Sequence, residues 1–362
     1  LVTSALFTDF DQDGRVDLLV AGEWMAFTFL RNAGDRFDDV SASTGLGDTH
    51  GWWNSLVAGD FDRDGDIDYV AGNLGLNTRY RATEQKPVRV HAGDFDRNGS
   101  LDPVLSSYVG DESYPVASRD LMVDEMITMK GRFQRYEDYA RATLDQTLSP
   151  TERGSAYVGR SVMFASVYLE NRGGGKFVRR PLPTLAQIAP TYGMLAIDAN
   201  GDGALDVLLV GNSHGPETQA GWDDASIGAV LLGDGRGGFS YVSGSASGFF
   251  VPGNARAVAD VLTDDHRSLV LVTQNGDTLR TFAPTRPSDT RALRVHPLDS
   301  YALLTDAQGR TSRVELPYGS TYLSQSSRYV RIGKQIVSVK VVDSRGASRS
   351  LPLDSQLARA AR

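Results

Sequence analysis

A nine-residue acidic motif occurs four times in this chain and constrains its fold more than any other feature. Each copy reads D-x-[DN]-x-[DN]-G-x-x-D, and the copies begin at Asp9, Asp60, Asp94 and Asp198. Up to five carboxylates within nine residues repel one another unless a cation lies among them. Because Ca²⁺ prefers oxygen ligands and tolerates irregular coordination, each copy is predicted to be a calcium-binding loop.

The spacing within the motif explains how the ligands would meet. Side chains at positions 1, 3 and 5 converge, and the glycine at position 6 permits the sharp reversal, as in the first half of an EF-hand loop. An EF-hand closes with a glutamate at position 12 between helices, whereas here the last acid is at position 9 and the flanking residues are strand-like. Metal-free Asx-turns are the alternative. The motif occurs four times with the glycine in register, and an apolar run follows each copy. This regularity favours bound metal over metal-free turns.

Short apolar segments flank each loop, so each loop is expected at the tip of a β-hairpin. In the first unit a third strand (27–30), a turn (32–35) and a fourth strand (36–41) follow, and residues 227–243 repeat this order. Four antiparallel strands per repeat predict the blades of a β-propeller. A degenerate fifth copy begins at Asp260, without the ligand spacing, and predicts a metal-free blade. About five blades are visible.

The long interval between the third and fourth loops predicts an insertion. Residues 118–158 abandon strand alternation, and Phe133, Tyr136, Ala140 and Leu144 recur at helical intervals. The sequence from Ser149 to Glu152 is a capping box with proline at the first helical position. We therefore expect a helical insertion within the third blade, and we expect the unit at 60–93 to be short and to lack a strand.

The C-terminal part has a different composition. Prolines 284 and 287 mark a linker, which divides the chain into a propeller (1–283) and a small β domain (284–362) with expected strands at 301–304, 312–316, 329–332 and 337–342. Residues 284–362 carry 13 basic and 6 acidic residues, a net charge of +7, while the whole chain carries −8 and residues 1–283 therefore −15. The basic charge suits either docking against the acidic part or simple solvation.

The four loops and the apolar strands after them resemble the FG-GAP/VCBS-type repeats of calcium-binding β-propellers, over about residues 1–283. Propellers of this family usually have seven blades, so further blades upstream or closure by C-terminal strands would complete the ring. The resemblance implies Ca²⁺ as the cofactor. The ligands it implies are Asp9, Asp11, Asp13 and Asp17; Asp60, Asp62, Asp64 and Asp68; Asp94, Asp96, Asn98 and Asp102; and Asp198, Asn200, Asp202 and Asp206.

A second resemblance concerns the C-terminal domain. The stretch 318–327, with its Tyr-Leu-Ser-Gln-Ser core, followed by 331–333, is similar to the small ASPIC/UnbV domain that follows such repeats. The chain departs from that pattern at Val342 and Asp343, where the family usually has a Trp-Pro pair. The resemblance implies a binding or structural role and names no reaction.

The composition indicates in which compartment the protein works and which kinds of partner it binds. The chain has no cysteine and no apolar run near the 18 residues of a membrane helix, so membrane insertion is not expected. Loops of this kind suit extracellular calcium levels, which predicts an extracellular, cell-surface or periplasmic protein. The acidic charge of residues 1–283 argues against nucleic acid. Because residue 1 lies close to a strand and no leader pattern precedes it, we expect part of a longer chain.

Function is predicted to be binding or adhesion, with an extracellular protein or glycan as partner. Each of the four tryptophans lies either after the second strand of a blade or in the link between two blades. All four are therefore expected on the rim opposite the calcium loops. The predicted ligand-binding residues there are Trp24, His50, Trp52, Trp53, Asn73, His214 and Trp222. The alternatives are a purely structural spacer and a polysaccharide hydrolase or lyase. His50 and His214 converging with an acid such as Glu217 would favour the enzyme, but no nucleophile motif accompanies them, and we expect no catalytic residues.

Overall fold

The structure is a computed structural model that describes residues 1–215, 221–263, 268–283, 291–319 and 322–353. It is mostly β, with 44% strand and 12% helix, as the sequence predicts. None of the helices in these described ranges has both the length and the apolar character needed to cross a membrane.

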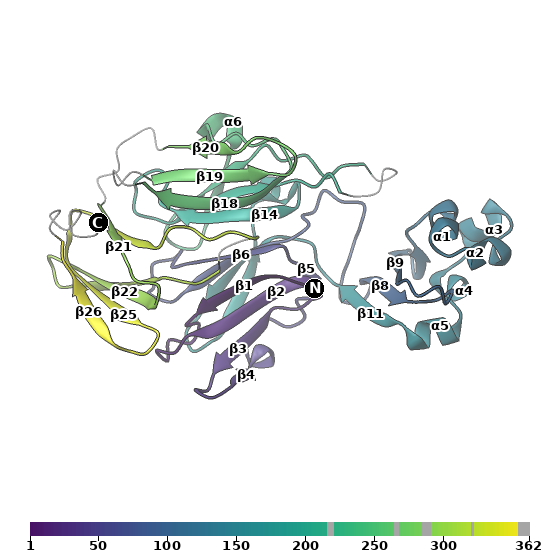
Figure 1. Cartoon of the computed structure of the whole chain (residues 1–362), viewed down its shortest axis with the longest axis horizontal. Helices are drawn as coiled ribbons and strands as arrows, with labels where there is room; N and C mark the ends of the chain where they lie inside the picture. The colour runs from purple at the N-terminus through teal and green to yellow at the C-terminus, as the bar shows by residue number, and fades with distance from the viewer. Residues whose placement is uncertain (216–220, 264–267, 284–290, 320–321, 354–362) are drawn as a thin grey trace.

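Four antiparallel sheets form the main body (Figure 1). The first contains β1 (Val2–Thr8), β2 (Asp17–Met25), β3 (Thr28–Asn32) and β4 (Phe37–Asp39), with the short β5 (Gly51–Trp52) on β2. The second contains β6 (Ser55–Gly59), β7 (Asp68–Gly72), β12 (Val167–Asn171) and β13 (Phe177–Pro181). The third contains β14 (Thr191–Ile197), β15 (Asp206–Gly211), β16 (Ala229–Gly233) and β17 (Phe239–Ser243). The fourth contains β18 (Ala255–Leu262), β19 (Ser268–Gln274) and β20 (Arg280–Phe282). Short helical turns link strands at η1 (Ser41–Ser43), η2 (Thr184–Gln187) and α6 (Gly244–Ser247).

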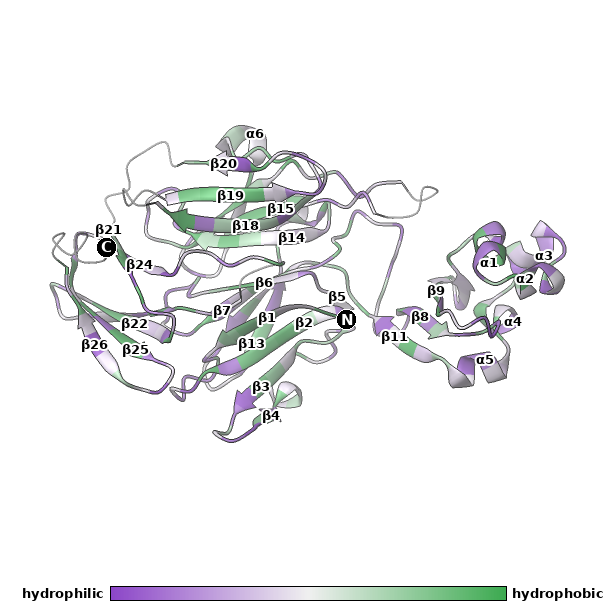
Figure 2. Cartoon of the chain, viewed as in Figure 1, coloured by the Kyte–Doolittle hydropathy of each residue, from purple (hydrophilic) through white to green (hydrophobic). Residues whose placement is uncertain are grey.

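The sheets lie in a row, and a separate hydrophobic core fills each space between neighbours. The first strands are adjacent, since β6 lies against both β1 and β14, and β14 lies against β18. Successive side chains of a strand point to opposite faces, so Leu56 enters the first core and Val57 the second. This two-sided burial explains why the second strands are continuous apolar runs, and Figure 2 shows hydrophobic residues along β2 and β19.

The third predicted blade is not part of this row. Residues 88–161 form a separate lobe, seen at the right of Figure 1, with the strand order β10-β9-β8-β11. Its strands are β8 (Val88–Gly93), β9 (Asp102–Val109), β10 (Glu112–Pro115) and β11 (Tyr157–Ser161), and its helices are α1 (Arg119–Glu125), α2 (Thr128–Arg132), α3 (Tyr136–Arg141), α4 (Leu144–Thr147) and α5 (Pro150–Ser155). A core that includes Met122, Met126 and Met129 joins helices and sheet.

The helices expected within residues 118–158 are α1 to α5, between β10 and β11. The segment inserted into the row is the whole lobe, which is larger than predicted and interrupts a different unit. It contains the third loop hairpin, β8–β9, and it lies between β7 and β12, which pair through Val167 and Ala71. The prediction that the unit beginning at residue 60 lacks a strand was wrong, because β12 and β13 complete it from about 100 residues downstream. The predicted capping box is confirmed, since the Ser149 side chain accepts from the Glu152 N–H at the start of α5.

The described part of the chain has four sheets in the row, where the sequence predicts about five blades, and it shows no closed ring. Asp260 also differs from expectation, because it lies inside β18 and pairs with Val270 instead of beginning a loop. The other four motifs each begin directly after a strand ends. Residues 264–267 of the degenerate copy lie outside the described residues.

The C-terminal region forms a small β unit with its own core. Its strands are β21 (Arg291–Arg294), which pairs with β24 (Tyr329–Ile332), and β22 (Asp299–Asp306), β23 (Thr311–Glu315), β25 (Ile336–Asp343) and β26 (Ser348–Leu351), which form one sheet. The four predicted strands coincide with β22 to β25. Main-chain bonds join Tyr318 to Phe7 of β1, Tyr322 to Tyr192 of β14 and Ser327 to Asp260 of β18, so this segment contacts three of the four first strands.

Candidate metal centres and the opposite rim

All four acidic loops connect the first and second strands of a hairpin. The first aspartate directly follows β1, β6, β8 or β14, and the last aspartate is the first residue of β2, β7, β9 or β15. In the row of sheets, the three loops at residues 9, 60 and 198 therefore lie at one end of the strands, which we call the loop rim. The loop at residue 94, the third in the sequence, belongs to the lobe.

The four loops share one backbone conformation. In the first, Gln12 and Gly14 both have positive φ, 59° and 87°. The equivalent residues in the other loops are Arg63 and Gly65, Arg97 and Gly99, and Gly201 and Gly203, all with positive φ. The sequence predicts this for position 6, where glycine stands. Position 4 was missed because three of its residues are not glycine, and left-handed backbone is uncommon for such residues.

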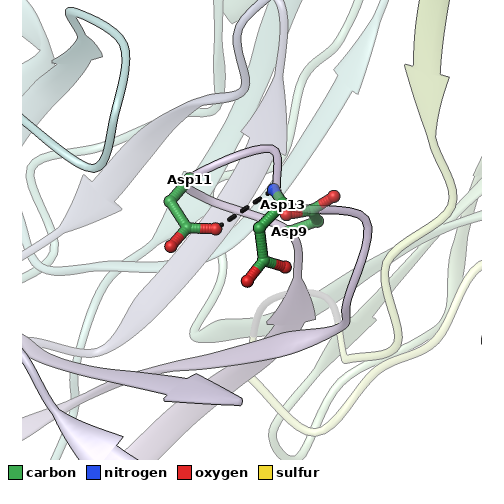
Figure 3. Close-up of side chains that lie close together, drawn as sticks. All are labelled: Asp9, Asp11 and Asp13. Atoms are coloured by element: carbon green, nitrogen blue, oxygen red, sulfur yellow. Dashed lines mark hydrogen bonds between the residues drawn. The ribbon is translucent and has the colours of Figure 1, made fainter. Parts of the chain in front are cut away.

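This conformation turns the carboxylates inward. The Asp13 N–H donates to Asp11 Oδ1 (3.2 Å) and the Gly14 N–H donates to Asp9 Oδ2 (3.0 Å). The glycine at position 6 donates to the first aspartate in the same way at Asp94 and Asp198 (3.0 Å). Figure 3 shows Asp9, Asp11 and Asp13 on one loop. Backbone amides thus hold the Asp9 and Asp11 side chains, whereas the Asp13 carboxylate accepts from the Arg15 N–H (2.9 Å) and forms an ion pair with the Arg15 guanidinium.

Three of the loops bring carboxylates within reach of one cation. One oxygen from each of three aspartates lies within 4.8 Å of the others in the sets Asp9, Asp11, Asp13; Asp60, Asp62, Asp68; and Asp94, Asp96, Asp102. Among the described residues, three buried oxygens of these loops have no hydrogen-bond partner: Asp9 Oδ1, Asp17 Oδ2 and Asp60 Oδ1. Buried acceptors of this kind are normally satisfied. An oxygen-seeking cation fits this donor set.

The fourth loop has the same backbone but a different arrangement of side chains. Asn200 Nδ2 donates to Asp202 Oδ2 (2.8 Å), and the Asp202 N–H donates back to Asn200 Oδ1 (2.8 Å). The Asn200 amide group is thus directed at a carboxylate, and among the described residues no three carboxylates of this loop converge on one point.

The last aspartate of the motif has a second, structural role. Asp68 is fully buried, and it accepts hydrogen bonds from the Phe61 N–H, the Asn171 N–H and the Tyr168 hydroxyl. Asp206 accepts from Ala199 and Gly233 in the same way, Asp17 accepts from Asn32, and Asp102 accepts from Phe95. The first three tie the loop to the third strand of their sheet. These hydrogen bonds account for the acid at position 9 whether or not the loop binds a metal ion.

Burial disfavours the charged form of several of these acids. It raises the pKa of Asp17 to about 7, of Asp68 to about 7 and of Asp60 to about 6, and neighbouring loop carboxylates add to the shifts. The pKa values of Asp11, Asp62 and Asp206 are raised for the same main reason. A bound cation would favour the ionised carboxylates.

These shifts predict how the calcium-free protein responds to pH. Since the folded-state pKa values lie above 3.8, the folded chain binds more protons than the unfolded chain, and stability from these groups is lost as pH rises through 6 to 7. We expect EDTA-treated protein to lose on the order of 3 kcal/mol of unfolding free energy between about pH 5 and 8. Urea denaturation at the two pH values measures this. Millimolar Ca²⁺ should abolish the loss, and equal stability in EDTA at both pH values would contradict the prediction.

Two arginines of the C-terminal unit reach acidic groups of the row. Arg313 lies 2.7 Å from Asp9 Oδ2 and 2.6 Å from Glu315, whose pKa burial raises to about 7. Arg331 lies 2.8 Å from Asp260, which also accepts from Tyr329 and Ser268. Part of the basic charge of this unit therefore contacts acidic residues. At Asp260, the cationic partner is the guanidinium group of Arg331.

The predicted ligand-binding residues at the opposite rim fall into two groups. Trp24 and Trp52 pack edge to face with centroids 4.7 Å apart, and the side chain of Trp222 is 63% exposed and stacks on His214 at 4.2 Å. Trp53 is fully buried against Phe27. The structure thus places Trp53 in the core, whereas Trp222 is on the surface.

Asn73 and His50 act in the scaffold. Asn73 is fully buried, and its Oδ1 accepts from the N–H groups of Trp52 and Leu74. His50 Nδ1 bonds to Asp48 (2.6 Å), and its carbonyl accepts from Val162 at the base of the lobe. His50 and His214 have different partners, and Glu217 lies outside the described residues.

A cavity of about 590 Å³ opens at this rim. The residues around it include Trp52, Trp222 and Glu23, together with Asp223 and Asp224. The sequence did not predict several other lining residues, among them Arg79, Tyr80 and Tyr192. Arg79 and Tyr80 belong to the connection into the lobe, which shows no periodicity, and Tyr192 is the second residue of β14. Only the packing of the sheets brings them together.

The comparison with known proteins found one family. The model of the FG-GAP-like repeat matches residues 9–71, from the first acidic loop to the second strand of the second sheet. The search of curated proteins returned no match. The chain therefore carries an FG-GAP-like repeat over the two hairpins whose loops hold the clusters at Asp9 and Asp60.

Proposed function

We propose that this chain is a calcium-stabilised binding module that works outside the cytoplasm and binds a protein or glycan. The observation that carries the proposal is the convergence of carboxylates in three acidic loops, with buried oxygens of Asp9, Asp17 and Asp60 left without a partner among the described residues. The FG-GAP-like repeat at residues 9–71 supports a repeat-based binding role. Millimolar extracellular Ca²⁺ suits loops of this kind.

The residues that would hold the ion are those at positions 1, 3, 5 and 9 of each loop, all of them carboxylates except the amides Asn98 and Asn200. When bound, the ion neutralises their mutual repulsion and allows them to stay ionised. The chain's own contribution is preorganisation, because the backbone N–H groups at positions 5 and 6 already fix the orientation of the acids. We propose that these ions are structural, since the last aspartate also ties each loop of the row to the third strand.

Partner binding is assigned to the opposite rim. There the connections between strands carry the exposed Trp222 and surround the cavity, while the loop rim is occupied by acids and their backbone bonds. We propose a binding role over catalysis, since His50 and His214 engage separate partners, Asp48 and Trp222.

Metal counting tests the calcium assignment. Replacement Asp62→Ala removes one of the three carboxylates that converge in the second loop, so we expect the bound Ca²⁺ to fall by one equivalent per chain. Equilibrium dialysis against millimolar Ca²⁺, with atomic emission on the protein and buffer compartments, measures the stoichiometry. The control is Asp111→Ala, in the exposed turn between β9 and β10, which should change nothing. Unchanged metal content in the Asp62 variant would refute the assignment.

A further inference from the structure

We propose that the cavity at the rim opposite the loops binds a saccharide, and that it prefers sugar units with a protonated amine over sugar units with a carboxylate. This inference rests on the proposed function, of which it specifies the ligand. It is carried by three features of the cavity, which are its shape, its aromatic walls and its charge.

The shape favours a small ligand or a short chain. A volume of about 590 Å³ lies within the range of ligand pockets, which is roughly 300 to 1,000 Å³. Its walls come from the end of β2, the connection into the lobe, the start of β14 and the segment after β15. A concave site between several connections suits a ligand that enters it, whereas a standard protein partner needs a broad surface.

The aromatic walls are held in place before any ligand arrives. Trp52 packs against Trp24, Tyr80 and Phe164 with centroids 4.7 to 5.3 Å apart. Tyr192 lies under the guanidinium of Arg256 at 3.9 Å, and Trp222 stacks on His214. Rigid rings of this kind offer flat apolar surface at low entropic cost, and the face of a sugar ring that carries only C–H groups can lie against them.

Polar groups beside the rings suit the hydroxyl groups of a sugar. Asn54, Asn77 and Ser213 line the same cavity and provide both donors and acceptors. The Trp52 Nε1–H is buried and has no acceptor among the described residues. A ligand that both donates and accepts hydrogen bonds would satisfy such a mixed lining better than an apolar ligand would.

The charged groups around the cavity determine which class of sugar it prefers. Three carboxylates, those of Glu23, Asp223 and Asp224, line the cavity, and two guanidinium groups lie beside them, that of Arg79 in the lining and that of Arg256 over the ring of Tyr192. An ammonium group is attracted by this excess of negative charge and by the aromatic faces, and a further carboxylate is repelled. Partly exposed charge pairs give modest energies, so we expect roughly threefold to tenfold steps in affinity.

The test is calorimetric titration of the full chain in Ca²⁺ with three oligosaccharides of equal length, at a mildly acidic pH where amines are protonated. The probes are oligomers of glucosamine, of N-acetylglucosamine and of galacturonic acid. We expect affinity to fall in that order. Absence of binding by all three, or tightest binding of the galacturonic acid oligomer, would overturn the inference.

Two variants and a control locate the site. Trp222→Ala, at a largely exposed side chain, should weaken binding at least tenfold, and Asp224→Asn should reduce the preference for glucosamine over N-acetylglucosamine. Phe37→Ala changes an exposed aromatic residue at the loop end of β4 and should leave every affinity unchanged. Full affinity in Trp222→Ala would overturn the inference. Calcium stoichiometry in the same samples still reports on the proposed function, so the two failures are distinguishable.

Discussion

Removal of Ca²⁺ with EDTA is expected to lower the melting temperature of the row of sheets by many degrees. The carboxylates of each loop would be left close together, several of them buried, without a counter-ion. A site held at 100-fold its dissociation constant contributes about 2.7 kcal/mol, and a domain has only about 5 to 15 kcal/mol in total. Several sites therefore account for much of the stability. Tryptophan fluorescence measures the transition, since all four tryptophans lie within residues 1–283.

The C-terminal unit provides the internal control for this experiment. No group of three converging acids occurs in its described residues, so hydrogen exchange in β22 and β25 should change less than exchange in β1 and β6. Hydrogen exchange in the C-terminal unit should still change slightly, because Arg313 of that unit forms an ion pair with Asp9 of the first loop. Superimposable melting curves with EDTA and with millimolar Ca²⁺ would disprove the calcium assignment.

Trp53→Ala is expected to destabilise the folded state by about 3 to 5 kcal/mol, the usual cost of removing a buried aromatic side chain. Trp53 is fully buried in the core between the first two sheets, lies 4.2 Å from Phe27 by ring centroid and donates from Nε1 to the Thr49 carbonyl (2.8 Å). The change would leave both a cavity and an unsatisfied carbonyl. Urea denaturation in Ca²⁺ measures the difference.

Trp222→Ala is the matched control, because it removes the same side chain from an exposed site. Its expected effect on stability is within about 0.5 kcal/mol, as for most surface substitutions. Equal destabilisation by both changes would mean that Trp222 is also a packing residue. Stability close to wild type in Trp53→Ala would instead contradict the placement of Trp53 in the core.

The sequence by itself determined the local features of this protein. The hairpins, the glycine at position 6, the capping box at Ser149 and the C-terminal strands all follow from short-range patterns, because loop conformation, helix capping and strand alternation depend on residues a few positions apart. The family match at residues 9–71 depends on the same local repeat. The convergence of aspartates in the first three loops is likewise a property of nine consecutive residues.

Tertiary structure decided which strands belong together. The pairing of Val167 with Ala71 joins segments that the lobe separates, and nothing local distinguishes the hairpin of the lobe from the hairpins of the row. The same holds for the burial of Trp53, the exposure of Trp222 and the ion pair of Arg313 with Asp9. Each depends on which surfaces pack against each other, and burial of apolar area is non-directional, so a local pattern specifies that a face is covered but does not specify by which segment.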